Sequence, residues 1–106
     1  MKYYKGIRDA HEDFGFPGSY RTGSVVKDGI VIRIYSNSKS KPDRFDKSGV
    51  FYYFLKSDKI REAFRENKKN NIGVYVFVRN LDLNKVEYHG KMMVKGFRGN
   101  YVLLSR

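Results

Sequence analysis

Residues 49–55 have the sequence GVFYYFL, the most aromatic stretch of this 106-residue chain. Aromatic residues in direct succession favour a β-strand over a helix. Side chains of a strand alternate between its faces, so Phe51 and Tyr53 share one face and Tyr52 and Phe54 share the other. We expect one pair to fill the core. The other pair is either covered by another part of the protein or free to stack on a base, and the sequence leaves both roles open.

Further strands are expected on both sides of this stretch. Asp28 and Gly29 form a strong two-residue hairpin signal, because both turn positions require a positive φ. Gly90 is expected to mark a bulge within a long strand. The ranges with strand-like alternation are residues 24–27, 30–35, 73–79, 86–97 and 101–104.

Two short helices complete the expected elements. The first covers residues 6–14, and its apolar positions share one face. The second covers residues 58–67, with Ser57 as its N-cap. Its core stripe consists of Ile60, Ala63 and Phe64. Together the elements predict an α+β domain with two short helices on a curled antiparallel sheet of about six strands. We expect residues 1–106 to form one domain, either a minimal protein or the N-terminal module of a longer one.

Composition narrows the function classes. The chain carries 22 Lys and Arg against 11 Asp and Glu, a formal charge of +11, which favours a polyanionic partner. An apolar share of 41% is too high for a disordered chain. No apolar run approaches the roughly 20 residues that cross a bilayer, and no signal peptide is evident. The absence of cysteine excludes disulfides and thiol catalysis. We therefore expect a cytoplasmic protein with no membrane partner.

Catalytic signals are weak. The only histidines are His11 and His89. The acidic residues around His11 do not all share a helix face, so a solvated face is favoured over a metal site. No acidic-x-Lys pair lies on an expected strand after Asp43, as Mg²⁺-dependent nucleases require, and no glycine-rich phosphate loop is present. The sequence predicts that this chain alone is not an enzyme and needs neither a metal nor a cofactor. Residues 95–102 only partly match RNA-binding signatures, and a hairpin turn carrying Arg98 is favoured there.

Several short motifs, taken in order, resemble the SRA-like domain found beside HNH nuclease domains in modification-dependent restriction enzymes. They are residues 8–15, 30–35, 45–46, 49–53, 60–64, 74–77 and 86–90. The resemblance implies a PUA-like curled pseudo-barrel that flips a modified base into a pocket, most often methylated or hydroxymethylated cytosine. It also implies a restriction system, with a nuclease domain or subunit as partner.

The resemblance assigns the pocket residues. Tyr53 takes the place of the tyrosine that stacks on the flipped base, and Phe45 and Asp46 take the places of residues that line the pocket. A carboxylate accepts a hydrogen bond from the exocyclic amine of cytosine. Without the resemblance, Asp46 is interpreted as a turn residue and Tyr53 as a core residue. The family continues with Thr-Gly-x-Gly where this chain has FLKS at residues 54–57, which leaves the pocket shape and the preferred modification open.

Basic residues are expected to hold the DNA backbone while the pocket specifies the base. Lys39, Lys41 and Arg44, in a polar loop, are assigned to phosphates or a groove near the flipped base. Further backbone contacts are assigned to Arg21, Lys95 and Arg98. The expected function is recognition of a modified base in double-stranded DNA. The alternatives are a PUA-like RNA-binding module, an enzyme of unrecognised type, and a basic adaptor for an acidic protein.

Overall fold

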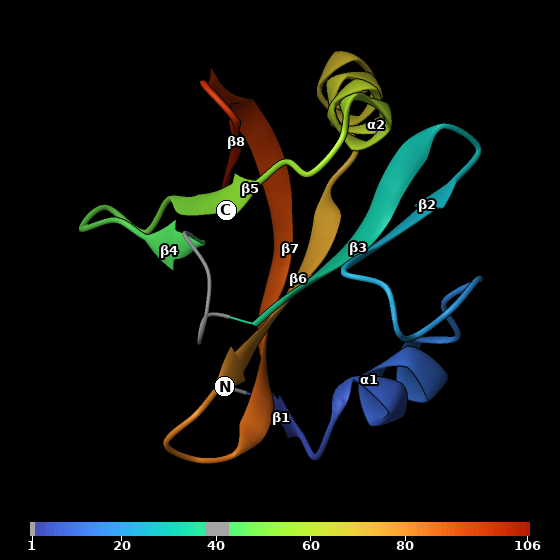
Figure 1. Cartoon of the computed structure of the whole chain (residues 1–106), viewed down its shortest axis with the longest axis vertical. Helices are drawn as coiled ribbons and strands as arrows, with labels where there is room; N and C mark the ends of the chain where they lie inside the picture. The colour runs from blue at the N-terminus through green and yellow to red at the C-terminus, as the bar shows by residue number, and fades with distance from the viewer. Residues whose placement is uncertain (1, 38–42) are drawn as a thin grey trace.

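The computed structural model describes residues 2–37 and 43–106 and confirms an α+β fold with two helices on a curled sheet (Figure 1). In chain order the elements are β1 (Lys2–Tyr4), α1 (Ile7–Phe14), β2 (Ser24–Lys27), β3 (Ile30–Ser36), β4 (Arg44–Phe45), β5 (Phe51–Phe54), α2 (Asp58–Lys69), β6 (Val74–Asn80), β7 (Lys85–Arg98) and β8 (Tyr101–Ser105).

The sheet has eight strands in the order β2-β3-β6-β7-β8-β5-β4, and β1 pairs with β7. The expected number was about six, because β1 and β4 span only three and two residues and are too short to show alternation. The sheet is also mixed rather than purely antiparallel, since β3 and β6 run parallel. These strands are not joined by a hairpin, and the long connection through α2 allows the chain to return in the same direction.

The two expected glycine features are present. Asp28 and Gly29 join β2 to β3 with φ values of 55° and 80°. Gly90 has a φ of 87°, and the register of β6 against β7 shifts beside it, so β7 carries a bulge there. β7 runs as one long curved strand through the centre of Figure 1. β7 pairs with β6 on both sides of the bulge, with β1 before it and with β8 beyond it.

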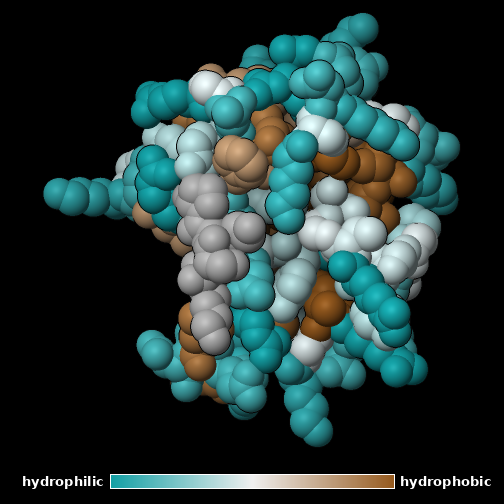
Figure 2. Space-filling view, in the orientation of Figure 1, coloured by the Kyte–Doolittle hydropathy of each residue, from teal (hydrophilic) through white to brown (hydrophobic). Residues whose placement is uncertain are grey.

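The two helices lie on opposite faces of the sheet. Alternation along β6 shows this, because its valines belong to the core that includes Phe64 of α2, whereas Tyr75 and Phe77 pack with Phe14 of α1. Phe51 and Tyr53 point into the α2 core, so one aromatic pair of β5 fills the core as expected. Polar side chains cover most of the face in Figure 2, with hydrophobic ones visible beside α2.

Asn67 joins α2 to β3 from a fully buried position. Its Oδ1 accepts a hydrogen bond from the Val31 amide at 2.6 Å, and its Nδ2 donates to the Val31 carbonyl at 2.9 Å. The same Nδ2 donates to the Ile72 carbonyl at 3.2 Å. In the parallel register of β3 and β6, Val31 lies beyond the first paired residue, Arg33. The Asn67 amide therefore satisfies backbone groups that β6 does not reach.

Arg33 is the least compensated buried group of the described core. Its side chain has no accessible surface, and its Nη2 donates to the Thr22 carbonyl at 3.3 Å. Nε and Nη1 have no hydrogen-bond partner among the described residues. Burial lowers the pKa of the guanidinium to about 10. Because the folded state lowers this pKa, burying the charge disfavours folding at neutral pH, and this cost is relieved only as the pH rises through about 10.

We expect Arg33→Met to raise the free energy of unfolding by about 1–3 kcal/mol, because methionine fills a similar space without buried donors that lack partners. Urea denaturation at neutral pH measures the change. Arg21→Met, at an exposed position, is the matched control and should leave stability nearly unchanged. A clear loss of stability in Arg33→Met would contradict this account of the guanidinium.

Candidate nucleic-acid interface

A cavity of about 730 Å³ lies between the segment that follows β4 and the end of the chain. Residues 45–50 form one wall, and β7, β8 and the C-terminal residue form the other. Its chemically distinctive lining residues are Phe45, Asp46, Lys47, His89 and Arg106. Two of the three residues assigned to the base pocket, Phe45 and Asp46, therefore line the same cavity.

Phe45 presents an aromatic ring at this cavity. It is 38% exposed, which is unusual for a phenylalanine in a fold with a well-formed core. The Phe51 ring, from the core, lies 4.7 Å from the Phe45 ring between centroids, and the His89 ring lies 4.8 Å away. These neighbours hold the ring in place while part of it stays accessible to a ligand.

Asp46 closes a tight turn with one of its carboxylate oxygens. Oδ1 accepts hydrogen bonds from the Ser48 hydroxyl at 2.8 Å, the Ser48 amide at 2.9 Å and the Val50 amide at 3.0 Å. The Ser48 hydroxyl bond, followed by the Val50 amide, lowers the pKa of the carboxyl, so it is ionised at neutral pH. Among the described residues these bonds all go to Oδ1, so Oδ2 retains its lone pairs for a ligand.

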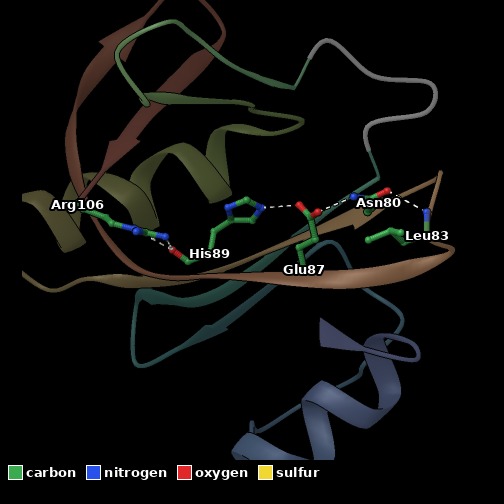
Figure 3. Close-up of polar contacts among 5 residues, drawn as sticks. All are labelled: Asn80, Leu83, Glu87, His89 and Arg106. Atoms are coloured by element: carbon green, nitrogen blue, oxygen red, sulfur yellow. Dashed lines mark hydrogen bonds and ion pairs between the residues drawn. The ribbon is translucent and has the colours of Figure 1, made fainter. Parts of the chain in front are cut away.

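His89 is held by a chain of polar contacts along β7 (Figure 3). Its Nε2 lies 2.9 Å from Oε1 of Glu87, and Oε2 of Glu87 accepts a hydrogen bond from Nδ2 of Asn80 at 2.5 Å. Arg106 donates to the His89 carbonyl from Nε at 3.1 Å and from Nη2 at 2.7 Å. With only 13% of its side chain exposed, His89 is a fixed wall of the cavity.

Sequence reasoning assigned no role to His89 or Arg106 in the pocket. The available signal was the spacing of Glu87 and His89, which places both side chains on one face of a strand. The contact between Arg106 and His89 has no signal in a local sequence pattern. It arises only because β8 pairs with β7 and brings the end of the chain beside His89. Phe45 and His89 also line a second hollow of about 500 Å³, together with Arg44, Arg79 and Glu87.

Tyr53 does not share the Phe45–Asp46 cavity. It is 6% exposed and packs edge-on against Phe64 of α2, with ring centroids 6.0 Å apart. Burial raises the pKa of its hydroxyl to about 12. Its polar end borders two smaller hollows of about 70 and 150 Å³, the larger of which is also lined by Tyr35 and Asp43. Two residues along β5 from Phe51, Tyr53 lies under α2, where its ring is part of the core.

The assigned backbone contacts occupy different parts of the surface. Arg44 and Arg98 lie together, both over the ring of Tyr52. Lys95 is exposed on β7, and Arg21 lies over Tyr20 in the segment between α1 and β2. Lys39 and Lys41 lie outside the described residues.

Within residues 2–37 and 43–106, no group of three or more His, Asp or Glu is placed to hold a metal ion. In the acidic segment of α1, Glu12 pairs with Arg8, and Asp13 contacts Lys2 and Tyr4. No helix in the described part of the chain has the length and apolar character to cross a membrane. No protein-family model matches the chain, and searches of curated proteins and of solved structures also found no match.

Proposed function

We propose that this chain binds double-stranded DNA and holds a modified base, methylated or hydroxymethylated cytosine, flipped out into the cavity of Phe45, Asp46 and His89. The observation that carries the proposal is the combination of an exposed aromatic ring and an ionised carboxylate in one cavity of about 730 Å³. That volume lies within the range of small-ligand pockets, about 300–1,000 Å³. In this role the chain is the targeting part of a restriction system.

The two groups supply complementary interactions. Stacking of a base on the Phe45 ring is worth about 1–3 kcal/mol. Oδ2 of Asp46 accepts a hydrogen bond from the exocyclic amine of cytosine, which thymine lacks. Flipping costs a few kcal/mol, so stacking and the amine contact together are of the size needed to offset it.

The distribution of charge separates the site for the base from the site for the phosphate backbone. Lys47 and Arg106 line the cavity, and the chain as a whole has a formal charge of +11. Phosphates are attracted to such a surface, but the negative charge of Asp46 disfavours a phosphate beside its own carboxylate. The cavity therefore favours a base, and the surrounding cations favour the backbone.

The test compares matched duplexes that contain cytosine, methylcytosine, hydroxymethylcytosine or N6-methyladenine, with single-stranded DNA and RNA of the same sequence as further arms. We expect tighter binding to a modified cytosine, and a linear, steep fall of log affinity with log salt for every duplex. Equal affinity for all four duplexes would contradict the base reader. Salt-independent binding would contradict the nucleic-acid assignment, and a preference for RNA would favour the RNA-binding alternative.

A further inference from the structure

The outer face of β4, β5 and β8 carries a layer of aromatic and arginine side chains, which we call the aromatic–arginine face. Arg44 of β4 pairs with Tyr52 of β5, and Phe54 of β5 pairs with Tyr101 of β8. On the other side of β8, Tyr101 pairs with Arg98 of β7. Tyr52 and Phe54 are the aromatic pair of β5 that does not enter the core with Phe51 and Tyr53.

Arginine and tyrosine are in direct contact on this face. The guanidinium carbon of Arg44 lies 4.6 Å from the Tyr52 ring centroid and 5.4 Å from that of Tyr101. Arg98 lies 5.8 Å from the Tyr52 ring, and its Nη1 donates to the Tyr52 hydroxyl at 3.2 Å. Tyr101 also lies edge-on to Phe54, with centroids 5.8 Å apart. The face thus consists of positioned rings with cations held beside them.

The helices pack elsewhere. α2 packs chiefly on β3 and β7, and α1 on β1. Tyr52 is buried beneath the arginines, whereas Phe54 and Tyr101 are only partly buried and both arginines are exposed. A hollow of about 250 Å³ at the end of the face is lined by Phe54, Lys56, Ser57, Asp58, Arg61 and Asn100. Its two cations outnumber its single carboxylate, so the positive character of the face continues into it.

We infer that the aromatic–arginine face binds an unpaired segment of nucleic acid, with bases stacked on Tyr101 and Phe54 and phosphates beside Arg44 and Arg98. Stacking platforms flanked by cations suit single strands, because every base has a flat face and every linkage carries a charge. An acidic protein partner would match the arginines but gives no reason for partly exposed rings between them. This inference goes beyond the base cavity and does not require that a base be flipped.

The geometry of β4 relates this face to the cavity. Arg44 and Phe45 are adjacent in the strand, so their side chains point to opposite faces. Arg44 lies on the aromatic–arginine face and Phe45 lines the cavity. Because β4 is the last strand of the sheet, a nucleic-acid strand is able to pass over this edge and contact both surfaces.

The test measures the affinity of labelled single-stranded DNA and RNA oligonucleotides by fluorescence anisotropy. Tyr101→Leu keeps an apolar side chain but removes the ring, and we expect it to weaken binding about five-fold to a hundred-fold. Tyr3→Leu, which removes an exposed tyrosine from β1, is the control and should leave the affinity unchanged. Circular dichroism and thermal unfolding verify that each variant is folded.

Arg98 gives a second, independent measurement. Arg98→Ala should weaken single-strand binding and reduce the slope of log affinity against log salt by about one. Arg98→Lys keeps the charge and should restore the slope, but not the full affinity, because an ammonium group does not stack on a ring as a guanidinium does.

Unchanged single-strand affinity in both Tyr101→Leu and Arg98→Ala would overturn the inference. Equal dependence of poly-glutamate binding on Tyr101 would also overturn it, in favour of an acidic protein partner. The base preference of duplexes is measured in the same variants. Single-strand binding that depends on Tyr101 in a protein without base preference would refute only the proposed base reader.

Discussion

Replacing Asn67 with leucine is expected to lower the free energy of unfolding by about 3 kcal/mol or more. Leucine keeps the number and branching of the side-chain heavy atoms but forms no hydrogen bonds. The Val31 amide, the Val31 carbonyl and the Ile72 carbonyl would each lose the hydrogen bond that the Asn67 side chain provides. A buried polar group without a partner costs about 1–3 kcal/mol. Urea denaturation followed by circular dichroism measures the effect.

Asn70→Leu is the matched control, since it makes the same substitution three residues further along, at the end of the same helix. The Asn70 side chain is exposed and donates one hydrogen bond, to the Glu66 carbonyl at 3.0 Å. We expect a change within about 0.5 kcal/mol. Similar losses in the two variants would show that the buried amide does not have the special role assigned to it.

Asp46→Asn is expected to remove most of the preference for modified cytosine while the fold is kept. The asparagine Oδ1 is able to accept the turn hydrogen bonds from Ser48 and Val50 that Asp46 now accepts. Its Nδ2, however, presents a donor where the carboxylate presented an acceptor. Hydrogen bonds to charged groups are worth about 1.5–3 kcal/mol, so the affinity for the preferred duplex should fall by about ten-fold to a hundred-fold.

The control for this prediction is Asp28→Asn, in the hairpin between β2 and β3. It changes the net charge by the same amount, and asparagine tolerates the positive φ of this position. The general effect of charge on phosphate attraction is therefore the same in both variants. Titrations on modified and unmodified duplexes should show reduced discrimination only in Asp46→Asn. Unchanged discrimination in that variant would show that the carboxylate does not read the base.

Local patterns predicted the parts of the fold that local physics determines. The turn at Asp28 and Gly29, the Ser57 cap and the bulge at Gly90 each follow from the conformational needs of a few residues. The alternation of side chains along β5 correctly predicted that one aromatic pair, Phe51 and Tyr53, lies in the core. The parallel pairing of β3 and β6 was missed, because hydrophobic patterns do not encode the direction in which a distant strand returns.

The candidate site was less accessible to sequence reasoning. Phe45 and Asp46 share a cavity as expected, but Tyr53 lies under α2, and which side chains a helix covers depends on its docking position. His89 and Arg106 are 17 residues apart and meet only through strand pairing. Sequence reasoning assigned Asp46 two alternative roles, one in a turn and one in the pocket. In the structure its carboxylate closes the turn, and the same residue lines the cavity.

The continuity of β7 has a consequence for how the molecule opens. The strand pairs with β1 before Gly90, with β8 beyond it and with β6 on both sides, so both halves of the sheet share the same run of backbone. Cooperative units in native-state exchange follow such shared elements. Amide protons around Phe77 and around Leu104, which belong to different hydrophobic clusters, should therefore exchange with deuterium through one common unfolding event rather than two separate ones.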